Sequence, residues 1–462
     1  MKKKRVFAVL LSGALSFGAL TACSALSTPN LPAYEQNSFV TTAWWAPYEI
    51  TEESFSLYKD AGFNTMLFVN HSRKSEIQDY NTTRYYIGSD LTNQTLEMCR
   101  KTGLNAIISE GKGYNIHQSD TVFTEVDYGD YKDIITGVHI EDEPSAQQLR
   151  ELCTADRIDN FKQAYSVPFM INLLPVTAAG ASTGTLNYEE YLQQYEECVL
   201  KVISDTPYIS VDFYPYHVEK YATMDRQWVS CYEQISQLAA KYHAEINYFI
   251  QTAEGNEFTD TLTEADIRYQ VYVALCFGGT SFSYYCYSTP GSYENGILSN
   301  PMYSACMLGQ DNQPTHLYDY VKKINSEIQA FAPAFKAYNF VKCMPVCVQS
   351  YGAENFKSEL YAMNTLPDFS DRIYISDIKT EGNLLVGCFD RAEDEAYMLA
   401  NYGYPDETDS IDLTITLKGG ATHAAVYGGK GYDGTPEIIA ADDGKLSLTI
   451  ASGDGKFIVP LF

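Results

Sequence analysis

Buried strands and amphipathic helices alternate along most of this chain, as its hydrophobic and polar positions indicate. Short apolar runs rich in Val, Ile, Phe and Tyr alternate with stretches in which apolar residues recur every three or four positions. The apolar runs predict eight strands, at Phe39–Ala46, Phe63–Asn70, Leu104–Glu110, Ile134–Glu143, Val167–Leu174, Tyr208–Tyr214, Glu245–Thr252 and Ser281–Tyr287. The periodic stretches predict helices at Glu52–Asp60, Thr92–Lys101, Ala146–Cys153 with a further helix to Ala164, Tyr188–Ile203, Trp228–Tyr242, Glu264–Cys276 and Tyr318–Phe331. Strands joined by helix-length connections pair in parallel, so eight such units predict a (β/α)8 TIM barrel at residues 39–338.

A different pattern begins at about residue 339. Short alternating segments are separated by turn signals such as Gly419-Gly420 and Asp443-Gly444. They predict strands at Leu384–Phe389, Ala396–Asn401, Ile411–Leu417, His423–Tyr427, Lys445–Ile450 and Lys456–Pro460. We therefore expect a C-terminal antiparallel β-sandwich domain at residues 339–462. It carries no evident nucleophile or base, and we interpret it as a packing or accessory domain, with carbohydrate binding as a minor alternative.

The first residues have the features of an export signal. A basic start, Lys2 to Arg5, precedes an apolar run, Val6 to Leu20, that is too short to cross a bilayer. The ending Leu-Thr-Ala-Cys at Cys23 resembles a bacterial lipobox, which implies cleavage before Cys23 and a lipid on that cysteine. We expect a lipoprotein signal peptide at residues 1–22 and a lipidated tether at 23–38, giving a membrane-anchored protein that faces outside the cell. The alternative is an ordinary secretory signal with an incidental cysteine.

Charge and motif content exclude several classes of function. With 59 acidic and 32 basic residues the formal net charge is -27, which repels nucleic acid and anionic membrane surfaces. We expect no nucleic-acid partner and membrane contact only through the lipid. One GxGxxG string begins at Gly429, but no helical pattern follows it, so we expect no nucleotide cofactor. The cysteines other than Cys23 contain no CxxC pair and resemble buried apolar residues, so we expect no metal.

The candidate chemistry begins in the segment Gly137–Ser145, GVHIEDEPS. Alternation along the fourth strand places Glu141 and Glu143 on one face, and Pro144 ends the strand just before a residue suited to cap a helix. A strand that ends in carboxylates and turns directly into a helix presents acids at the mouth of a barrel. The alternative is a charged loop that only caps the helix. Repulsion among Glu141, Asp142 and Glu143 argues against that alternative.

The other strand ends supply amides, acids and aromatic rings to the same mouth. The residues expected to line it are Trp44, Trp45, Asn70, Glu110, Glu141, Asp142, Asn172, Asp212, Tyr214, Tyr216, Gln251 and Tyr285. Aromatic rings stack on sugar faces, and amides and acids bind hydroxyl groups. The composition of this mouth therefore predicts a carbohydrate-binding site. For Trp44 and Trp45, packing against the eighth strand is an equal alternative.

Glycoside hydrolysis needs two carboxyl groups, one of which donates a proton. Glu143 fits the acid, and a like charge on Glu141, about 7 Å away along the strand, would favour its protonated form. Glu254 follows the seventh strand and is the candidate for the second carboxylate. Asp212 and Glu110 are rivals that are better suited to substrate binding or support.

The Asp142-Glu143-Pro144 sequence resembles the Asn-Glu-Pro of clan A glycoside hydrolases, which include family 42 β-galactosidases. It is also similar to that of uncharacterised bacterial lipoprotein barrels. The resemblance implies that Glu143 is the acid/base, that a glutamate of the seventh strand is the nucleophile, and that configuration is retained. Asp142 departs from the expected Asn, and Gln251 leaves Glu254 as the nearest acid of that strand. Either Glu254 is the nucleophile of a lipid-anchored extracellular glycoside hydrolase, or the chain is a non-catalytic glycan-binding lipoprotein on the same barrel.

Overall fold

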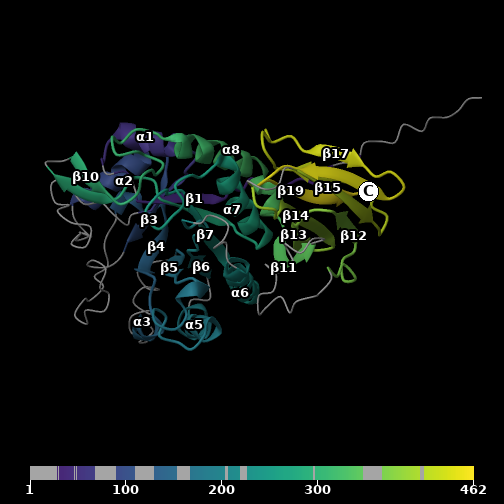
Figure 1. Ribbon diagram of the computed structural model, residues 1–462, viewed down its shortest axis with the longest axis horizontal. Coiled ribbons are helices and arrows are strands. Elements are labelled where there is room, and N and C mark those ends of the chain that lie inside the picture. Colours follow the sequence, from purple (N-terminus) through teal and green to yellow (C-terminus); the bar gives the residue numbers. More distant parts are fainter. Residues whose placement is uncertain are drawn as a thin grey trace, which may run out of the picture.

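A (β/α)8 barrel and a β-sandwich make up the protein, and Figure 1 shows them side by side. The computed structural model describes residues 29, 31–45, 47, 49–67, 90–109, 129–152, 167–202, 207–218, 226–294, 297–346, 367–405 and 410–462. The barrel strands are β1 (Val40–Trp44), β2 (Thr65–Leu67), β3 (Asn105–Ser109), β4 (Ile135–Asp142), β5 (Phe169–Leu173), β6 (Tyr208–Val211), β7 (Glu245–Gln251) and β8 (Ser281–Tyr285). They form one parallel sheet in the order β1-β8-β7-β6-β5-β4-β3-β2. The predicted barrel is confirmed.

Asn64, just before β2, joins the two ends of this sheet. Its backbone N–H donates to the carbonyl of Thr41 at 3.2 Å, and its Oδ1 accepts the Thr41 N–H at 3.0 Å. Its Nδ2 also donates to the carbonyl of Phe39 at 2.7 Å. One side chain thus satisfies backbone groups that the short β2 leaves without a partner strand.

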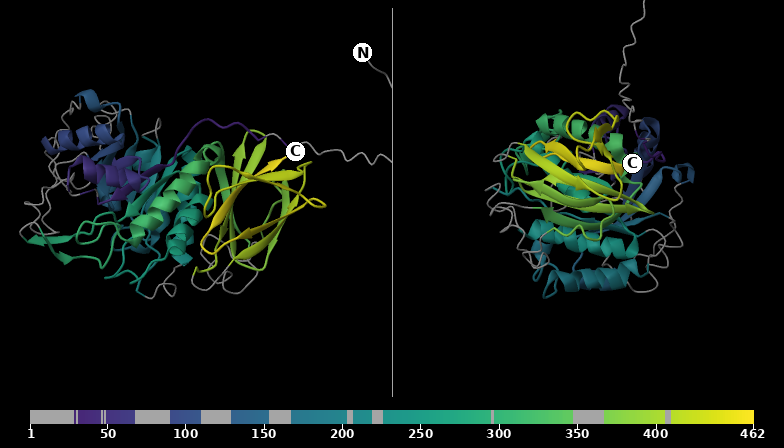
Figure 2. Two further views of the ribbon diagram at one scale, coloured as in Figure 1. Left: turned by 90° about the horizontal axis from the view of Figure 1, so that it is seen from above. Right: turned by 90° about the vertical axis from the view of Figure 1, so that its right-hand side faces the viewer.

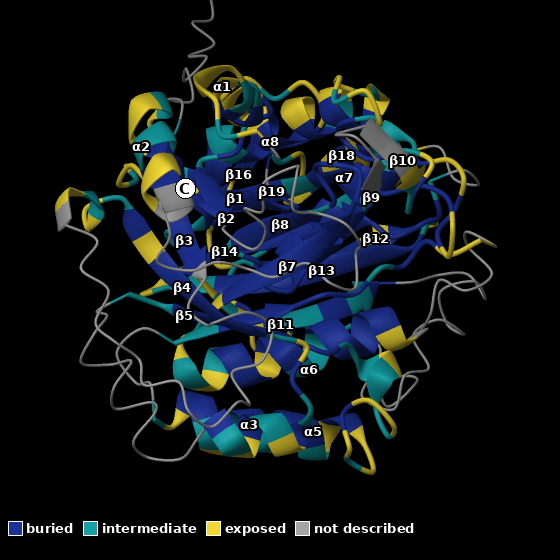
Figure 3. Ribbon diagram, turned by 90° about the vertical axis from the view of Figure 1, so that its left-hand side faces the viewer, coloured by how far each residue is buried: buried dark blue, intermediate teal, exposed yellow. Residues whose placement is uncertain are grey.

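Helices surround the barrel with their apolar faces inward, as the burial colours of Figure 3 show. They are α1 (Glu52–Asp60), α2 (Asp90–Thr102), α3 (Ala146–Leu152), α5 (Tyr188–Tyr195) with a π-helical turn at Glu196–Leu200, α6 (Arg226–Tyr242), α7 (Glu264–Cys276) and α8 (His316–Phe335). Two short 3-10 helices lie at Gly129–Tyr131 and Val176–Ala178. The further helix predicted after Cys153 lies outside the described residues. Within the described ranges, no helix combines the length and the apolar character needed to cross a membrane.

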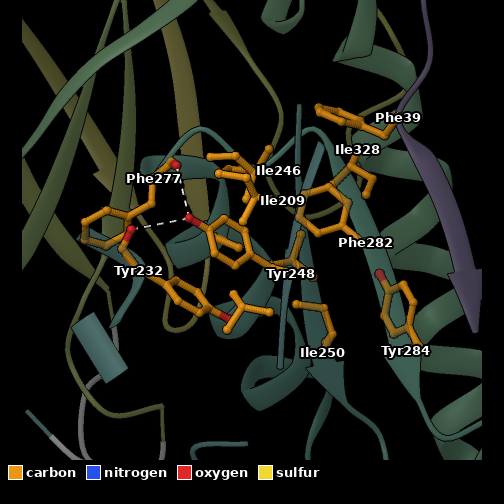
Figure 4. Packing of buried hydrophobic residues seen from close by; sticks show 14 of the residues in the cluster. Phe39, Ile209, Tyr232, Ile246, Tyr248, Ile250, Phe277, Phe282, Tyr284 and Ile328 are labelled. Atoms are coloured by element: carbon orange, nitrogen blue, oxygen red, sulfur yellow. Dashed lines mark hydrogen bonds between the residues drawn. The ribbon is translucent and has the colours of Figure 1, made fainter. Parts of the chain in front are cut away.

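Tyrosines fill much of the layer between strands and helices. Tyr248 of β7 stacks on Tyr232 of α6 with ring centroids 4.0 Å apart (Figure 4). Its hydroxyl donates to the carbonyl oxygens of Tyr232 and Phe277, each at 3.4 Å. Tyrosine therefore supplies large apolar area to this core while its hydroxyl finds a backbone acceptor. Many of the chain's 38 tyrosines need no carbohydrate to explain them.

The sandwich consists of a six-stranded and a three-stranded antiparallel sheet. The larger has the order β11-β13-β14-β19-β16-β17 and the smaller β12-β15-β18. The strands are β11 (Asn339–Val346), β12 (Ile375–Thr380), β13 (Leu384–Arg391), β14 (Asp394–Asn401), β15 (Ile411–Leu417), β16 (His423–Tyr427), β17 (Glu437–Ala440), β18 (Lys445–Ile450) and β19 (Gly455–Leu461). The predicted sandwich is confirmed, with β11, β12 and β17 added. A hairpin of β9 (Gly291–Glu294) and β10 (Ile297–Pro301) lies at the far end of the barrel from the sandwich (Figure 1).

The central strands of the six-stranded sheet, β13, β14 and β19, are buried on both faces, because their second face packs against α7 and α8. Along β13, Leu384 and Val386 belong to the sandwich core, whereas Leu385 and Phe389 belong to the barrel's apolar core. Gly387 lies where β13 crosses α7, and a Cβ there would come within 2.5 Å of the Cys276 carbonyl oxygen. This close approach requires glycine and brings the two domains into direct contact.

A buried charge cluster also joins the domains. Arg268 of α7 is 2% exposed and contacts Glu327 of α8, and its Nη1 lies 3.6 Å from Asp454 Oδ1 in the sandwich. The GxGxxG string lies beside it, and backbone N–H groups of this string donate to these carboxylates. Gly431 donates to Glu327 at 2.6 Å and Lys430 donates to Asp454 at 2.8 Å. The string therefore binds acids of its own chain.

The segment before β1 lies over the junction of the two domains, where Figure 2 shows it as a purple trace. The ring of Tyr34 packs against those of Tyr338 and Tyr427, with centroids 6.3 Å apart in each pair. The Arg391 guanidinium lies 5.5 Å from the Tyr34 ring centroid. Part of the predicted tether, residues 23–38, is thus packed against the folded domains.

We expect Arg268→Gln to lower the free energy of unfolding by about 3 kcal/mol or more, because it leaves two buried carboxylates without their cation. Chemical denaturation of both proteins measures the change. Lys323→Gln is the matched control, since it removes an exposed partner of Glu264 at 3.2 Å and should cost less than about 1 kcal/mol. Equal losses in the two variants would contradict the structural role given to Arg268.

Candidate active site

Glu143 occupies a strained position directly after β4. Its φ of +49° lies in the left-handed region, which non-glycine residues seldom adopt. Its N–H donates to the carbonyl of Asn172 at 2.8 Å. The chain then enters α3 through a capping box, in which the Gln148 N–H donates to Ser145 Oγ at 3.3 Å and the Ser145 N–H donates to Gln148 Oε1 at 2.7 Å. The predicted helix cap is confirmed, and strain of this kind is concentrated at functional sites.

Two tyrosines of α5 fix the turn that carries Glu143. The Tyr191 hydroxyl donates to the carbonyl of Pro144 at 2.7 Å and accepts the N–H of Leu174 at 3.3 Å. The Tyr188 hydroxyl donates to the carbonyl of Leu174 at 2.9 Å. Both tyrosines are buried, so the ends of β4 and β5 are held at a fixed separation.

A β-bulge in β4 changes the alternation expected from the sequence. The register against β5 shifts between His139 and Glu141, so that Ile140 is an extra residue. Glu141 then pairs with Ile171, which belongs to the apolar layer between strands and helices. The bulge therefore breaks the simple alternation between His139 and Glu141, two residues that a regular strand would place on one face.

Burial of Glu141 has an electrostatic consequence. Burial raises the pKa of its carboxyl group to about 8, with a backbone hydrogen bond from Asp142 acting against the shift and the charge of Asp142 adding to it. Burial also lowers the pKa of His139 to about 4. Both groups are therefore largely neutral at pH 7 inside the strand.

A continuous chain of buried polar groups runs around the inside of the barrel. The Asn172 Nδ2 donates to Asp142 Oδ1 at 3.2 Å, and the Asn172 Oδ1 accepts Ser210 Oγ at 2.9 Å. Asn247 continues the chain, donating to Ser210 Oγ at 2.9 Å and accepting the hydroxyls of two serines of β8 at 3.0 Å each. From β4 through β8 to β1 its members are Asp142, Asn172, Ser210, Asn247, Ser281, Ser283 and Thr42. The chain fixes Asp142 and Asn172, the residues on either side of the Glu143 backbone.

Asp212 brings a second carboxyl group to Glu143. It follows β6, two residues after Ser210, and its side chain forms a hydrogen bond with that of Glu143. Asp212 is buried, whereas Glu143 is exposed. Sequence reasoning proposed both residues for the mouth and named Asp212 only as a rival to Glu254 for the second carboxylate.

Both carboxyl groups hold protons more tightly than usual. Burial raises the pKa of Asp212 well above its usual range, and the charges of Glu143 and Asp142 raise it further. Loss of bulk water among the surrounding protein atoms raises the pKa of Glu143 as well, although the hydrogen bond to Asp212 opposes the shift. Two carboxyl groups this close cannot both ionise readily, so the pair holds its last proton more tightly than an isolated carboxyl group does.

Aromatic rings form one wall near this pair. The rings of Tyr214 and Tyr285 are 5.1 Å apart, and both side chains are half-buried. Behind them Phe258 stacks on Tyr303 at 5.4 Å, and the Tyr303 hydroxyl lies 3.2 Å from that of Tyr285 and donates to Glu257 at 3.0 Å. Phe258, Tyr303 and Glu257 were missed from the sequence because they lie in loops beyond the strand ends.

Trp44 and Trp45 belong to the same apolar cluster but are almost fully buried. The Trp44 ring makes edge contacts with His139 at 5.6 Å and with Phe249 at 5.8 Å between centroids. These ring contacts are with β4 and β7, whereas the alternative expected packing against the eighth strand, with which Trp44 pairs through its backbone. A sugar-binding role for either tryptophan stays a prediction.

Gln251 is fully buried and bound to the backbone of the loop after β6. Its Nε2 donates to the Tyr216 carbonyl at 2.8 Å and its Oε1 accepts the Tyr216 N–H at 3.0 Å. The Tyr216 hydroxyl in turn donates to the carbonyl of Asp266 at 3.2 Å. These contacts give Gln251 and Tyr216 a positioning role, and substrate contact by either stays a prediction.

The Glu254 carboxylate has partners within its own loop region. Its Oε1 accepts the Leu262 N–H at 2.7 Å and lies 3.0 Å from His316 Nε2 at the start of α8. Its N–H donates to the carbonyl of Ala305 at 2.9 Å. No contact between Glu254 and Glu143 supports the predicted nucleophile role of Glu254, which stays a prediction.

Three predicted residues, Cys23, Asn70 and Glu110, lie outside the described residues. Within the described part of the chain, no group of three or more His, Cys, Asp or Glu side chains is arranged to hold a metal ion.

No family model and no curated protein matches the chain. A glycoside hydrolase family 30 subfamily 8 xylanase from Clostridium acetobutylicum matches in structure at 10% identity over 93% of this chain and 98% of its own, with a TM-score of 0.40. An endo-beta-1,4-mannanase from Thermotoga petrophila matches at 10% identity over 90% and 98%, with a TM-score of 0.39. A glucosidase from Croceicoccus marinus matches at 8% identity over 94% and 97%, with a TM-score of 0.42. Similarities of this size assign neither family nor activity, so function must be argued from the site.

We expect the stability difference between the wild type and Glu141→Gln to depend on pH. Above about pH 4.5 the unfolded chain has lost the proton that folded Glu141 keeps up to about pH 8, so unfolding releases a proton and wild-type stability falls as pH rises. The wild type should therefore lose up to about 1.4 kcal/mol per pH unit relative to Glu141→Gln between pH 5 and 8. Urea unfolding across this range measures the slope, with Glu189→Gln on the exposed face of α5 as the control. A flat difference for Glu141→Gln would contradict the assignment.

Proposed function

We propose that the protein is a glycoside hydrolase in which Glu143 is the general acid/base. The observation that supports this most is the proton-holding pair of Glu143 and Asp212 at strand ends of a (β/α)8 barrel. A carboxyl group that keeps its proton near neutral pH can protonate a glycosidic oxygen. The half-buried rings of Tyr214 and Tyr285 offer surfaces on which a sugar can stack.

In this proposal Asp212 supports the acid and does not attack the sugar. Acid and nucleophile are about 5 Å apart in retaining enzymes and farther apart in inverting ones, because the scissile bond lies between them. Two hydrogen-bonded carboxyl groups leave no room for that bond. Asp212 therefore lies behind Glu143 and shares a proton with it, and Glu143 donates that proton to the leaving oxygen.

Retention of configuration belongs to the same proposal and rests on the sequence resemblance. It requires a nucleophile on the far side of the sugar from Glu143. Glu254 can serve only if its carboxylate exchanges the contacts with Leu262 and His316 for the substrate. Glu110, at the end of the third predicted strand, is the rival.

We expect Glu143→Gln to reduce kcat on unactivated glycosides by about 10²–10⁴-fold, because the leaving oxygen loses its proton donor. Initial rates on a panel of aryl glycosides and oligosaccharides measure the effect, and Glu189→Gln is the surface control. Asp212→Asn should displace the limb of the pH–rate profile that reports the acid, which a merely structural change would not do. Full activity of Glu143→Gln on a substrate that the wild type cleaves would contradict the proposal.

The same experiments identify the nucleophile. A fluorinated glycoside that stops at the covalent intermediate would attach to the attacking carboxylate of a retaining enzyme. Peptide mapping then locates the label at Glu254, at Glu110 or elsewhere. A turnover product of inverted configuration would reject retention.

The alternative is a non-catalytic glycan-binding protein on the same barrel. The occupied Glu254 carboxylate favours it, since this candidate nucleophile is bound to Leu262 and His316 and is not free to attack. Saturable sugar binding without wild-type turnover across the panel would support this alternative and reject the enzyme.

We also propose that the protein is a lipoprotein anchored outside the cell through Cys23, as the lipobox-like ending of the signal suggests. The wild type should then require detergent for release from membranes and incorporate a labelled fatty acid. Cys23→Ala should lose the label, while Ser24→Ala should keep it. Labelling that persists in Cys23→Ala would reject this anchor.

A further inference from the structure

Two cysteines meet inside the barrel mouth, near the aromatic wall. Cys286 directly follows β8, and Cys306 lies between β10 and α8. Both are fully buried in the cluster that contains Trp44 and Tyr303. Their Sγ atoms are 3.0 Å apart, within about 1 Å of the length of a disulfide bond.

The surrounding backbone holds the two cysteines in register. The Met307 N–H donates to the carbonyl of Cys286 at 3.2 Å, and the Thr315 hydroxyl donates to the carbonyl of Cys306 at 2.6 Å. The Leu308 N–H donates to the carbonyl of Tyr287 at 2.7 Å. Because both segments are fixed by hydrogen bonds next to each cysteine, closing the remaining gap needs only a small side-chain movement.

We propose that Cys286 and Cys306 form a disulfide bond that ties the end of β8 to the segment before α8. The two thiols lose two protons and two electrons, and one Sγ–Sγ bond forms. A small-molecule or protein disulfide accepts the electrons and is reduced to two thiols. Such oxidants act on exported proteins and are scarce in the cytosol.

Other buried thiols provide a contrast. The Cys276 Sγ lies 3.4 Å from the Met398 carbonyl oxygen, and the Cys231 Sγ lies 3.7 Å from the Tyr188 hydroxyl. Their contacts are with oxygen atoms and not with a second sulfur. These residues fit the sequence interpretation of cysteines as buried apolar side chains, whereas Cys286 and Cys306 do not.

The bond would stabilise the mouth. It closes a loop that contains the β9–β10 hairpin and Tyr303, whose hydroxyl contacts Tyr285 at 3.2 Å. The same loop includes Ala305, which accepts the N–H of Glu254. Constraining this loop in the unfolded chain adds to the stability of the fold that presents the wall.

Peptide mapping under non-reducing conditions tests the bond directly. Trypsin is unsuitable, because no lysine or arginine lies between Arg268 and Lys322. A protease that cleaves after glutamate separates residues 265–294 from 295–327. The protein is refolded with reduced and oxidised glutathione, alkylated without reductant and digested. The expected product is the two peptides joined, with a mass two hydrogens below their sum, and reduction should separate them.

Three single substitutions identify the cysteines that form the link. Cys286→Ala and Cys306→Ala should abolish it, whereas Cys276→Ala, in the same peptide as Cys286, should retain it. Reduction should also lower the Tm of the wild type by a few degrees. It should leave the Tm of a double variant, Cys286→Ala with Cys306→Ala, unchanged. Complete alkylation of Cys286 and Cys306 after the glutathione treatment, or a link through Cys276, would overturn the proposal. No activity is measured, so this outcome is independent of the glycosidase proposal.

Discussion

The barrel depends on a continuous set of hydrogen bonds among polar side chains in its interior, from β4 through β8 to β1. Each buried group that loses its partner costs about 1–3 kcal/mol, so the strands that share these bonds cannot slip past one another. Asn247 shows the constraint most clearly, since it joins Ser210 of β6 to both serines of β8. The same bonds end at Asp142, the residue before Glu143. Satisfying the interior of the barrel therefore also fixes the backbone from which the acid projects.

The site combines a carboxyl group on an exposed residue, Glu143, with that of the buried Asp212. Glu143 adopts a left-handed backbone at an energetic cost, and the hydrogen bonds at the ends of β4 and β5 make that conformation persist. Asp212 lies in surroundings that disfavour its charge. Strain at one residue and desolvation at the other are both unfavourable for folding alone. Their coincidence at a strand end is the strongest physical sign of function in this chain.

The sequence predicted the barrel because each β/α unit has its own local pattern, ending with helices such as α7, whose bounds match the prediction. It also identified Glu143 and Asp212 as strand-end acids. It named Asp212 only as a rival second carboxylate and did not predict its contact with Glu143, because that contact depends on how two strand ends far apart in the sequence pack together. Gln251 shows a similar limit of prediction from sequence. A polar side chain at a strand end can bind a neighbouring backbone as readily as it can line the pocket, and Gln251 binds the backbone of Tyr216. In the sandwich, the four-residue edge strand β17 is too short for alternation to be recognised.

The packing of Tyr34 between barrel and sandwich determines how the molecule would stand on a membrane. Seven residues separate Cys23 from Leu31, where the continuously described chain begins, so these two residues lie about 29 Å apart at most. A lipid on Cys23 would hold the domain junction close to the lipid headgroups. The β9–β10 hairpin marks the opposite end of the barrel, so the mouth would open away from the bilayer, toward polymers that diffuse in from outside.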